Sequence, residues 1–214
     1  MKEADLVDEY STDGTGWARF DSTRKHRYRL ARAVSLKAKE LCGVMSPGAV
    51  WNVPFAWLTN EELTRVVFVM LNPSTADAFK PDPTVSKCVQ FAALWGADVL
   101  EVVNLFSIRT PYPEDVRQLH ADDRGGSVTN NAQIIAACER PNVQRVVVAW
   151  GNNGKLDDRD MEVRYLIRGY FSEHSIARRL CALKLLGDPR STPIHPLARG
   201  KQFVPLTIIP VPWP

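Results

Sequence analysis

Short apolar runs followed by polar residues dominate the pattern of the chain. Residues 66–71, 100–103 and 146–149 are almost wholly apolar, as strands buried on both faces of a sheet are. Residues 180–186 have a similar character and predict a fourth strand. Helical patterns separate these runs. The alternation predicts an α/β fold, a three-layer sandwich with a central, mainly parallel sheet.

Capping residues mark where helices begin and end. Asp82 followed by Pro83 is typical of a helix N-terminus, and Gly96 is typical of the residue after a helix. Further helices are expected over residues 129–138 and 160–168.

The first part of the chain is less regular. Residues 27–32 alternate in polarity and predict a half-exposed edge strand. Residues 1–24 contain Gly14 and Gly16 and have little periodicity. We therefore expect a mobile or loosely docked N-terminal segment at 1–24, followed by a single α/β domain over 25–214.

Composition narrows the class of protein. The 214 residues are 45% hydrophobic and 24% charged, with a net charge of +3, as in globular proteins. No apolar run approaches the ~20 residues that span a bilayer, and the acidic start is unlike a signal peptide. These features predict a cytoplasmic protein with no membrane partner.

The sequence lacks the motifs that are typical of several classes of metal and cofactor site. The four cysteines are isolated, which predicts reduced, buried thiols and no zinc or iron–sulfur site. The histidines form no ligand motif, and there is no glycine-rich phosphate loop. We expect no metal and no cofactor.

Basic residues concentrate in two regions, 19–39 and 164–201. Such runs are typical of solvated surface. They are also compatible with two edges of a groove that binds phosphates. The sequence leaves both interpretations open.

Polar side chains follow the predicted strands. Asn72, Asn104 and Asn152 come directly after apolar runs, and His195 follows the fourth. In parallel α/β sheets, ligands bind beyond the carboxyl ends of the strands. These residues therefore predict a binding site at that rim, although each asparagine could simply form an Asx turn and the histidine could be a surface residue.

Longer motifs resemble a known family. VVFVMLNPSTADAFKPDPTVSKCVQFAALWG, EVVNLFSIRTPYP, VVVAWGNNG and PIHPL are similar to a bacterial family catalogued as domain of unknown function 1643. The order of the motifs also distantly resembles the uracil-DNA glycosylase superfamily, whose members share a three-layer α/β sandwich with a parallel sheet.

This second resemblance implies roles for individual residues. Asn72 would position the attacking water, Asn104 would read the edge of a flipped pyrimidine, and His195 would stabilise charge on the departing base. Asp77 is a reserve candidate for the general base. The other expected substrate contacts are Pro73, Ser74, Thr75, Phe106, Trp150, Gly151 and Asn152, and the expected contacts to the nucleic-acid backbone are Arg199 and Lys201.

The sequence thus favours a base-excising hydrolase that acts on an unusual or modified base in DNA. One alternative is a non-catalytic module that binds nucleic acid or a nucleotide-like small molecule at the same rim. Another is a hydrolase or transferase of a free nucleoside. The oligomeric state stays open.

Overall fold

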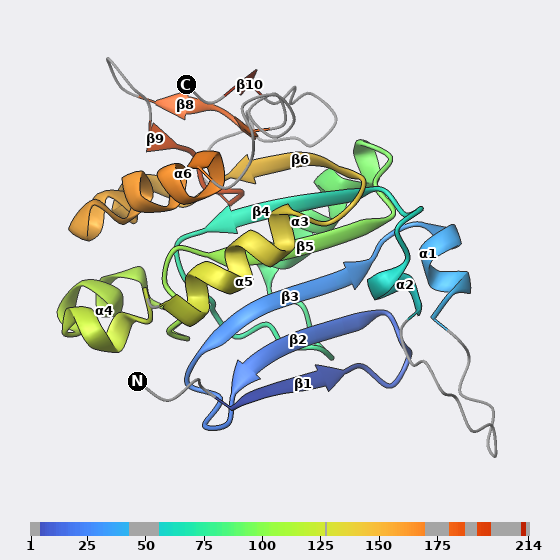
Figure 1. The fold of residues 1–214 in the computed structure, drawn as a ribbon, viewed down its shortest axis with the longest axis horizontal. Helices are drawn as coiled ribbons and strands as arrows, with labels where there is room; N and C mark the ends of the chain where they lie inside the picture. Colours follow the sequence, from blue (N-terminus) through green and yellow to red (C-terminus); the bar gives the residue numbers. More distant parts are fainter. Residues whose placement is uncertain are drawn as a thin grey trace.

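The computed structural model describes residues 5–42, 56–126, 128–169, 180–186, 192–197 and 211–212, which form an α/β fold (Figure 1). The strands are β1 (Leu6–Tyr10), β2 (Gly16–Asp21), β3 (Arg27–Ala33), β4 (Arg65–Met70), β5 (Val99–Asn104), β6 (Val143–Val148), β7 (Leu180–Ala182), β8 (Leu185–Leu186), β9 (Thr192–Pro193) and β10 (Val211–Pro212). The α-helices are α1 (Leu36–Glu40), α2 (Ala56–Thr59), α3 (Pro83–Leu94), α4 (Pro113–Gln118), α5 (Val128–Cys138) and α6 (Arg159–Gly169). The 3-10 helices are η1 (Ala121–Arg124) and η2 (Gly151–Asp158).

The main sheet is mixed, whereas the sequence predicted a mainly parallel one. Its strand order is β1-β2-β3-β5-β4-β6-β7, and the two-residue strand β10 pairs with β7. The strands β5, β4, β6 and β7 are mutually parallel, while β1, β2 and β3 add to β5 in antiparallel fashion. Antiparallel strands need only short connections, so the apolar runs joined by helices accounted for the parallel half alone.

Helices cover both faces of the sheet. Helix α3 packs in one apolar cluster with Phe68 and Val102, while α5 and α6 pack in another with Val69 and Val103. Figure 1 shows α5 and α6 in front of the sheet. The chain leaves β4 toward β5 and later returns to β6 on the other side of β4. The carboxyl ends of β4 and β6 therefore form a topological switch point, where ligands of such sheets bind.

Residues 6–21 form a hairpin in the main sheet, unlike the loosely docked segment expected from the sequence. Strands β1 and β2 pair along their full length, and Trp17 and Phe20 are buried. Gly14, with a φ of +73°, lies in the turn between them. The small and polar residues that suggested loose structure therefore serve a tight turn.

Strand β3 is fully buried and central, so the prediction of a half-exposed edge strand is wrong. The three arginines that suggested exposure are each paired. Arg29 contacts Glu101, Arg27 donates to the carbonyl of Ala76, and Arg32 donates to that of Asp77. Buried charges are tolerated when they are hydrogen-bonded in this way.

The predictions for the parallel half are largely confirmed. Asp82 caps α3 by accepting from the Val85 N–H at 2.8 Å, and Gly96, at a φ of +71°, follows the helix. Residues 180–186 divide between β7 and β8, which belong to different sheets. All four cysteines are buried free thiols. No helix in the described ranges combines the length and the apolar character needed to cross a membrane.

A buried carboxylate neutralises charge in the sheet. Glu101 on β5 is 1% exposed and faces three guanidinium groups, those of Arg29, Arg65 and Arg140. Arg65 also donates to the carbonyl oxygens of Trp57 and Leu58. The network joins β3, β4, β5 and the segment around α2.

We expect Glu101→Gln to lower the free energy of unfolding by about 3–5 kcal/mol, because it leaves buried guanidinium groups without a counter-charge. Urea-induced unfolding measures the loss. Glu61→Gln is the matched control, since Glu61 is exposed and has no ion pair within the described residues. Equal stability of the two variants would contradict a neutralising role for Glu101.

Candidate functional site

Three loops meet at the carboxyl ends of the parallel strands. They follow β4, β5 and β6, and the β9 segment lies beside the third. The β4 and β5 loops are joined by backbone hydrogen bonds, from the Phe106 N–H to the Leu71 carbonyl and from the Thr110 N–H to the Pro73 carbonyl, both at 2.9 Å. The candidate site therefore lies at the carboxyl ends of β4 and β5, next to the switch point between β4 and β6.

Three arginines hold the β4 loop by its backbone. Arg109, Arg27 and Arg32 donate to the carbonyl oxygens of three consecutive residues, 75, 76 and 77 respectively. The bond from Arg27 is 2.6 Å long and wholly buried, whereas that from Arg109 is 3.5 Å long and exposed. Charged donors make the stronger hydrogen bonds of proteins, so this clamp determines the path of the loop.

Asn72 has a fixed amide orientation. Its Nδ2 donates to the carbonyl oxygens of Pro73 at 3.0 Å and Thr110 at 2.9 Å. Two acceptors require the amino group on that side, which leaves Oδ1 of the half-buried Asn72 as an acceptor with no partner among the described residues. The Asn72 side chain can thus stabilise the turn through Nδ2 and hold a water through Oδ1.

Asn104 is fully buried, and neither atom of its amide has a hydrogen-bond partner. It ends β5 and is in register with Met70 of β4. Because Val103 and Leu105 belong to the cluster under α5, strand alternation places Asn104 on the α3 side. Buried amides without any partner are rare and indicate a missing hydrogen-bonding group, either a water or a ligand.

His195 lies at the end of β6, next to η2. Its Cβ would be 3.8 Å from a Cβ placed on Gly151. The Nδ1 atom accepts from the Leu197 N–H at 3.2 Å, which requires the proton of a neutral imidazole to be on Nε2. Burial lowers the pKa of His195, although the Asp82 carboxylate opposes the shift. The ring is therefore mainly neutral at pH 7, with one N–H to donate.

Asp77, the reserve candidate for the general base, and Asp82 both cap local structure. Asp77 Oδ1 accepts from the N–H groups of Phe79 and Lys80, each at 2.9 Å. Asp82 is the buried N-cap of α3. Neither is hydrogen-bonded to Asn72, so the structure assigns them a positioning role in their turns.

The other expected contacts are divided between core and surface. Phe106 and Trp150 are 3% exposed and belong to the cluster packed under α5 and α6, which makes them core residues. Asn152 is exposed on η2. Arg199 and Lys201 lie outside the described residues.

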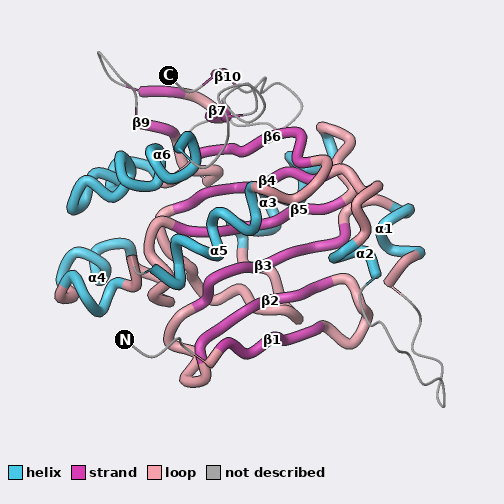
Figure 2. Tube along the Cα trace, in the orientation of Figure 1, coloured by secondary structure: helices cyan, strands magenta, loops and turns pink. Residues whose placement is uncertain are grey.

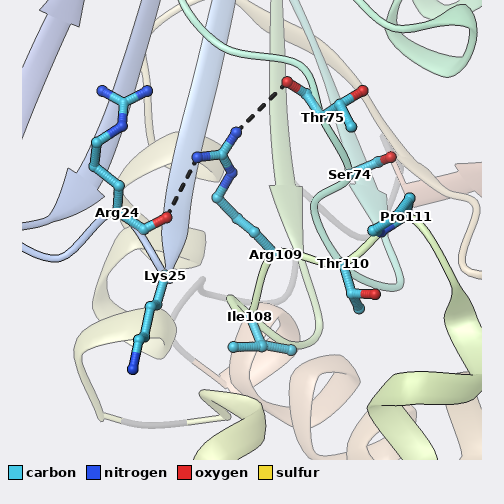
Figure 3. Close-up of a pocket in the computed structure, with 8 residues that line it drawn as sticks. All are labelled: Arg24, Lys25, Ser74, Thr75, Ile108, Arg109, Thr110 and Pro111. Atoms are coloured by element: carbon cyan, nitrogen blue, oxygen red, sulfur yellow. Dashed lines mark hydrogen bonds between the residues drawn. The ribbon is translucent and has the colours of Figure 1, made fainter.

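A basic cavity of about 370 Å³ adjoins the β4 and β5 loops (Figure 3). Its lining residues are Arg24, Lys25, Ser74, Thr75, Ile108, Arg109, Thr110 and Pro111. Of these, the sequence pointed to Ser74 and Thr75 alone as site residues. Arg24 and Lys25 belonged to the first basic region, but only the antiparallel pairing of β3 with β5 brings them to this rim.

Among the residues that the structure describes, no three His, Cys, Asp or Glu side chains gather as metal ligands would.

Residues 54–197 match a family model described as "Protein of unknown function (DUF1643)". This segment is about two-thirds of the chain. The chain belongs to the DUF1643 family. The part shared with DUF1643 contains Asn72, Asn104 and His195, whereas Arg24 and Lys25 precede it. No curated protein and no solved structure matches the chain, so the resemblance to uracil-DNA glycosylases stays a prediction.

We expect Arg27→Met to loosen the β4 loop, because it leaves the buried carbonyl of Ala76 without a donor, at a cost of about 1–3 kcal/mol. Hydrogen exchange followed by mass spectrometry should show faster exchange in peptides that cover residues 72–80. Arg117→Met, at an exposed position of α4, is the control. Unchanged exchange in those peptides would contradict the clamp.

Proposed function

We propose that this protein is an N-glycosyl hydrolase of the uracil-DNA glycosylase type, which removes an unusual or modified base from nucleic acid. The observation that carries the proposal is the buried, unpartnered amide of Asn104. An amide presents a donor beside an acceptor, which complements the hydrogen-bonding edge of a pyrimidine. A base that enters the site would satisfy both atoms at once.

Asn72 supplies the place for the attacking water. Because its Nδ2 is held by two carbonyl groups, Oδ1 is the atom left to accept a hydrogen bond. A water held there would add to C1′ of the sugar as the N-glycosidic bond breaks. The bonding electrons leave with the base, and the proton lost by the water ends on the base. An amide orients water but does not deprotonate it, which suits a departing group that leaves readily.

His195 supplies stabilisation for the leaving base. Its neutral ring keeps a proton on Nε2, because Nδ1 accepts from the backbone of Leu197. A fixed N–H donor aimed at developing negative charge is the largest single contribution in many enzymes. The lowered pKa preserves this form through pH 7.

Base entry requires a local movement. Asn104 is fully buried. Its register partner on β4, Met70, belongs to the same apolar cluster as Ala76 of the clamped loop. A base therefore displaces part of the loop that residues 72–80 form. The exposed bond from Arg109 to the Thr75 carbonyl is the weakest part of the clamp.

One observation favours a non-catalytic reader of the same ligand. Asp77 and Asp82 both cap turns, so no carboxylate is hydrogen-bonded to Asn72 to draw a proton from water. Such a protein would bind a base or nucleotide through Asn104 without turnover.

The decisive experiment incubates the protein with single- and double-stranded DNA containing uracil or another altered pyrimidine and scores alkali-labile abasic sites. We expect cleavage, with losses of about 100-fold or more in Asn72→Ala and Asn104→Leu, since each removes a group that acts on the reacting unit. Asn60→Ala, near the opposite ends of the strands, is the control.

Two results would contradict parts of the proposal. Abasic sites formed equally by wild type and Asn72→Ala would exclude the water site assigned to Asn72, although not hydrolysis itself. Binding that Asn104→Leu abolishes, without abasic sites on any of these substrates, would establish the non-catalytic reader.

A further inference from the structure

We infer that the basic cavity binds a phosphate group of the ligand whose base reaches Asn104, so that the substrate is a nucleotide or nucleic acid and not a free base or nucleoside. The inference rests on the proposed function for the base, but its own support is the charge and hydrogen bonding of the cavity.

The cavity is lined by more positively charged side chains than there are carboxylates paired with them. Arg24 pairs with Glu9. Lys25 is exposed and has no ion pair, and Arg109 bonds to carbonyl oxygens of Arg24 and Thr75 but to no carboxylate. The positive charge of Lys25 and Arg109 therefore favours the binding of an anion.

Arg109 is held in place as a preorganised donor. Its Cζ lies 5.0 Å from the centroid of the Phe20 ring, and the Cζ of Arg24 lies 4.5 Å from the same centroid. Burial lowers the pKa of Arg109 and the neighbouring Arg24 lowers it further, while Asp77 and Asp21 oppose the shift. An anion between the two guanidinium groups would relieve their repulsion.

Polar groups without partners complete the cavity. Among the residues that the structure describes, none forms a hydrogen bond with the hydroxyl groups or backbone N–H groups of Ser74 and Thr75. The clamp holds the carbonyl groups of residues 75–77 on arginines, so these N–H groups remain the unused donors of the loop. Successive N–H groups and hydroxyls beside fixed cations are typical of phosphate sites.

The position and size of the cavity fit a nucleotide. The cavity and Asn72 share the β4 loop, and Thr110, which lines the cavity, accepts from the Asn72 amide. A volume of about 370 Å³ lies at the lower end of the roughly 300–1,000 Å³ found for small-molecule sites. A phosphate held here would set the distance from the backbone of the ligand to the base-reading amide.

The first test uses inorganic phosphate, which does not depend on the identity of the base. Binding is followed by the ³¹P line width for wild type, Lys25→Gln, Arg109→Gln and Lys37→Gln. We expect a fivefold or greater loss of affinity in the first two variants and none in Lys37→Gln, which removes the same charge from exposed α1. Lys25 is exposed, so its variant keeps the test valid if Arg109→Gln fails to fold.

A second arm identifies the source of the phosphate. Deoxyuridine, its 5′-monophosphate and a single-stranded oligonucleotide containing uracil are titrated at several salt concentrations. Tighter binding of the monophosphate than of deoxyuridine, lost in Lys25→Gln, supports a free nucleotide. Tighter binding of the oligonucleotide, with a salt slope about one unit smaller in Lys25→Gln, supports nucleic acid.

Equal affinity of wild type and Lys25→Gln for every phosphate-bearing probe would overturn the inference, as would the absence of phosphate binding. These outcomes are separate from those for hydrolysis. Phosphate binding without abasic sites would support the phosphate site and contradict the hydrolase. Abasic sites, together with a phosphate affinity that Lys25→Gln does not change, would support the hydrolase and contradict the phosphate site.

Discussion

The rim of this protein depends on the contact between arginine side chains and the carbonyl groups of residues 75–77. The eleven residues between the end of β4 and the Asp82 cap of α3 have many available paths. Fixing three successive peptide groups from one side removes most of them, at the cost of burying charge. Burial lowers the pKa of Arg27 to about 9, so the guanidinium group that makes the buried bond to the Ala76 carbonyl stays charged at pH 7. The loop is thus held by a full charge and not by a neutral hydrogen bond.

Buried arginines on the two faces of the sheet have different partners. Arg29 and Arg65 meet a carboxylate, Glu101, whereas Arg27 and Arg32 meet carbonyl dipoles. Dipoles satisfy hydrogen bonds without cancelling charge, so the positive charge of Arg27 and Arg32 is offset by carboxylates that do not bond to them, such as Asp77 and Asp82. Figure 2 shows these strands side by side in one continuous sheet, in which the antiparallel strands extend the parallel half.

The sequence predicted the parallel half well because its signals are local. Apolar runs, the Asp82 cap and Gly96 determine structure within a few residues of themselves. Strand β3 was misjudged because the partners that make its arginines tolerable are distant, as Glu101 lies 72 positions from Arg29 in the sequence. The strand-end rule predicted Asn72, Asn104 and His195 as site residues, and their role stays a prediction. It could not find the cavity, since Arg24 reaches the rim only through an antiparallel pairing that no local pattern encodes.

The amides and the imidazole at the rim come from a different part of the chain than most of the cations. The amides and the imidazole follow parallel strands inside the segment shared with the DUF1643 family, residues 54–197. The cations of the clamp and of the cavity come mostly from residues 24–32, which precede that segment. Strand β3 joins them, because it supplies the arginines that shape the β4 loop and begins beside the cavity. The N-terminal strands are therefore part of the site. A fragment limited to the shared segment would retain Asn104 and Arg109 but lose Arg27 of the clamp and both Arg24 and Lys25 of the cavity.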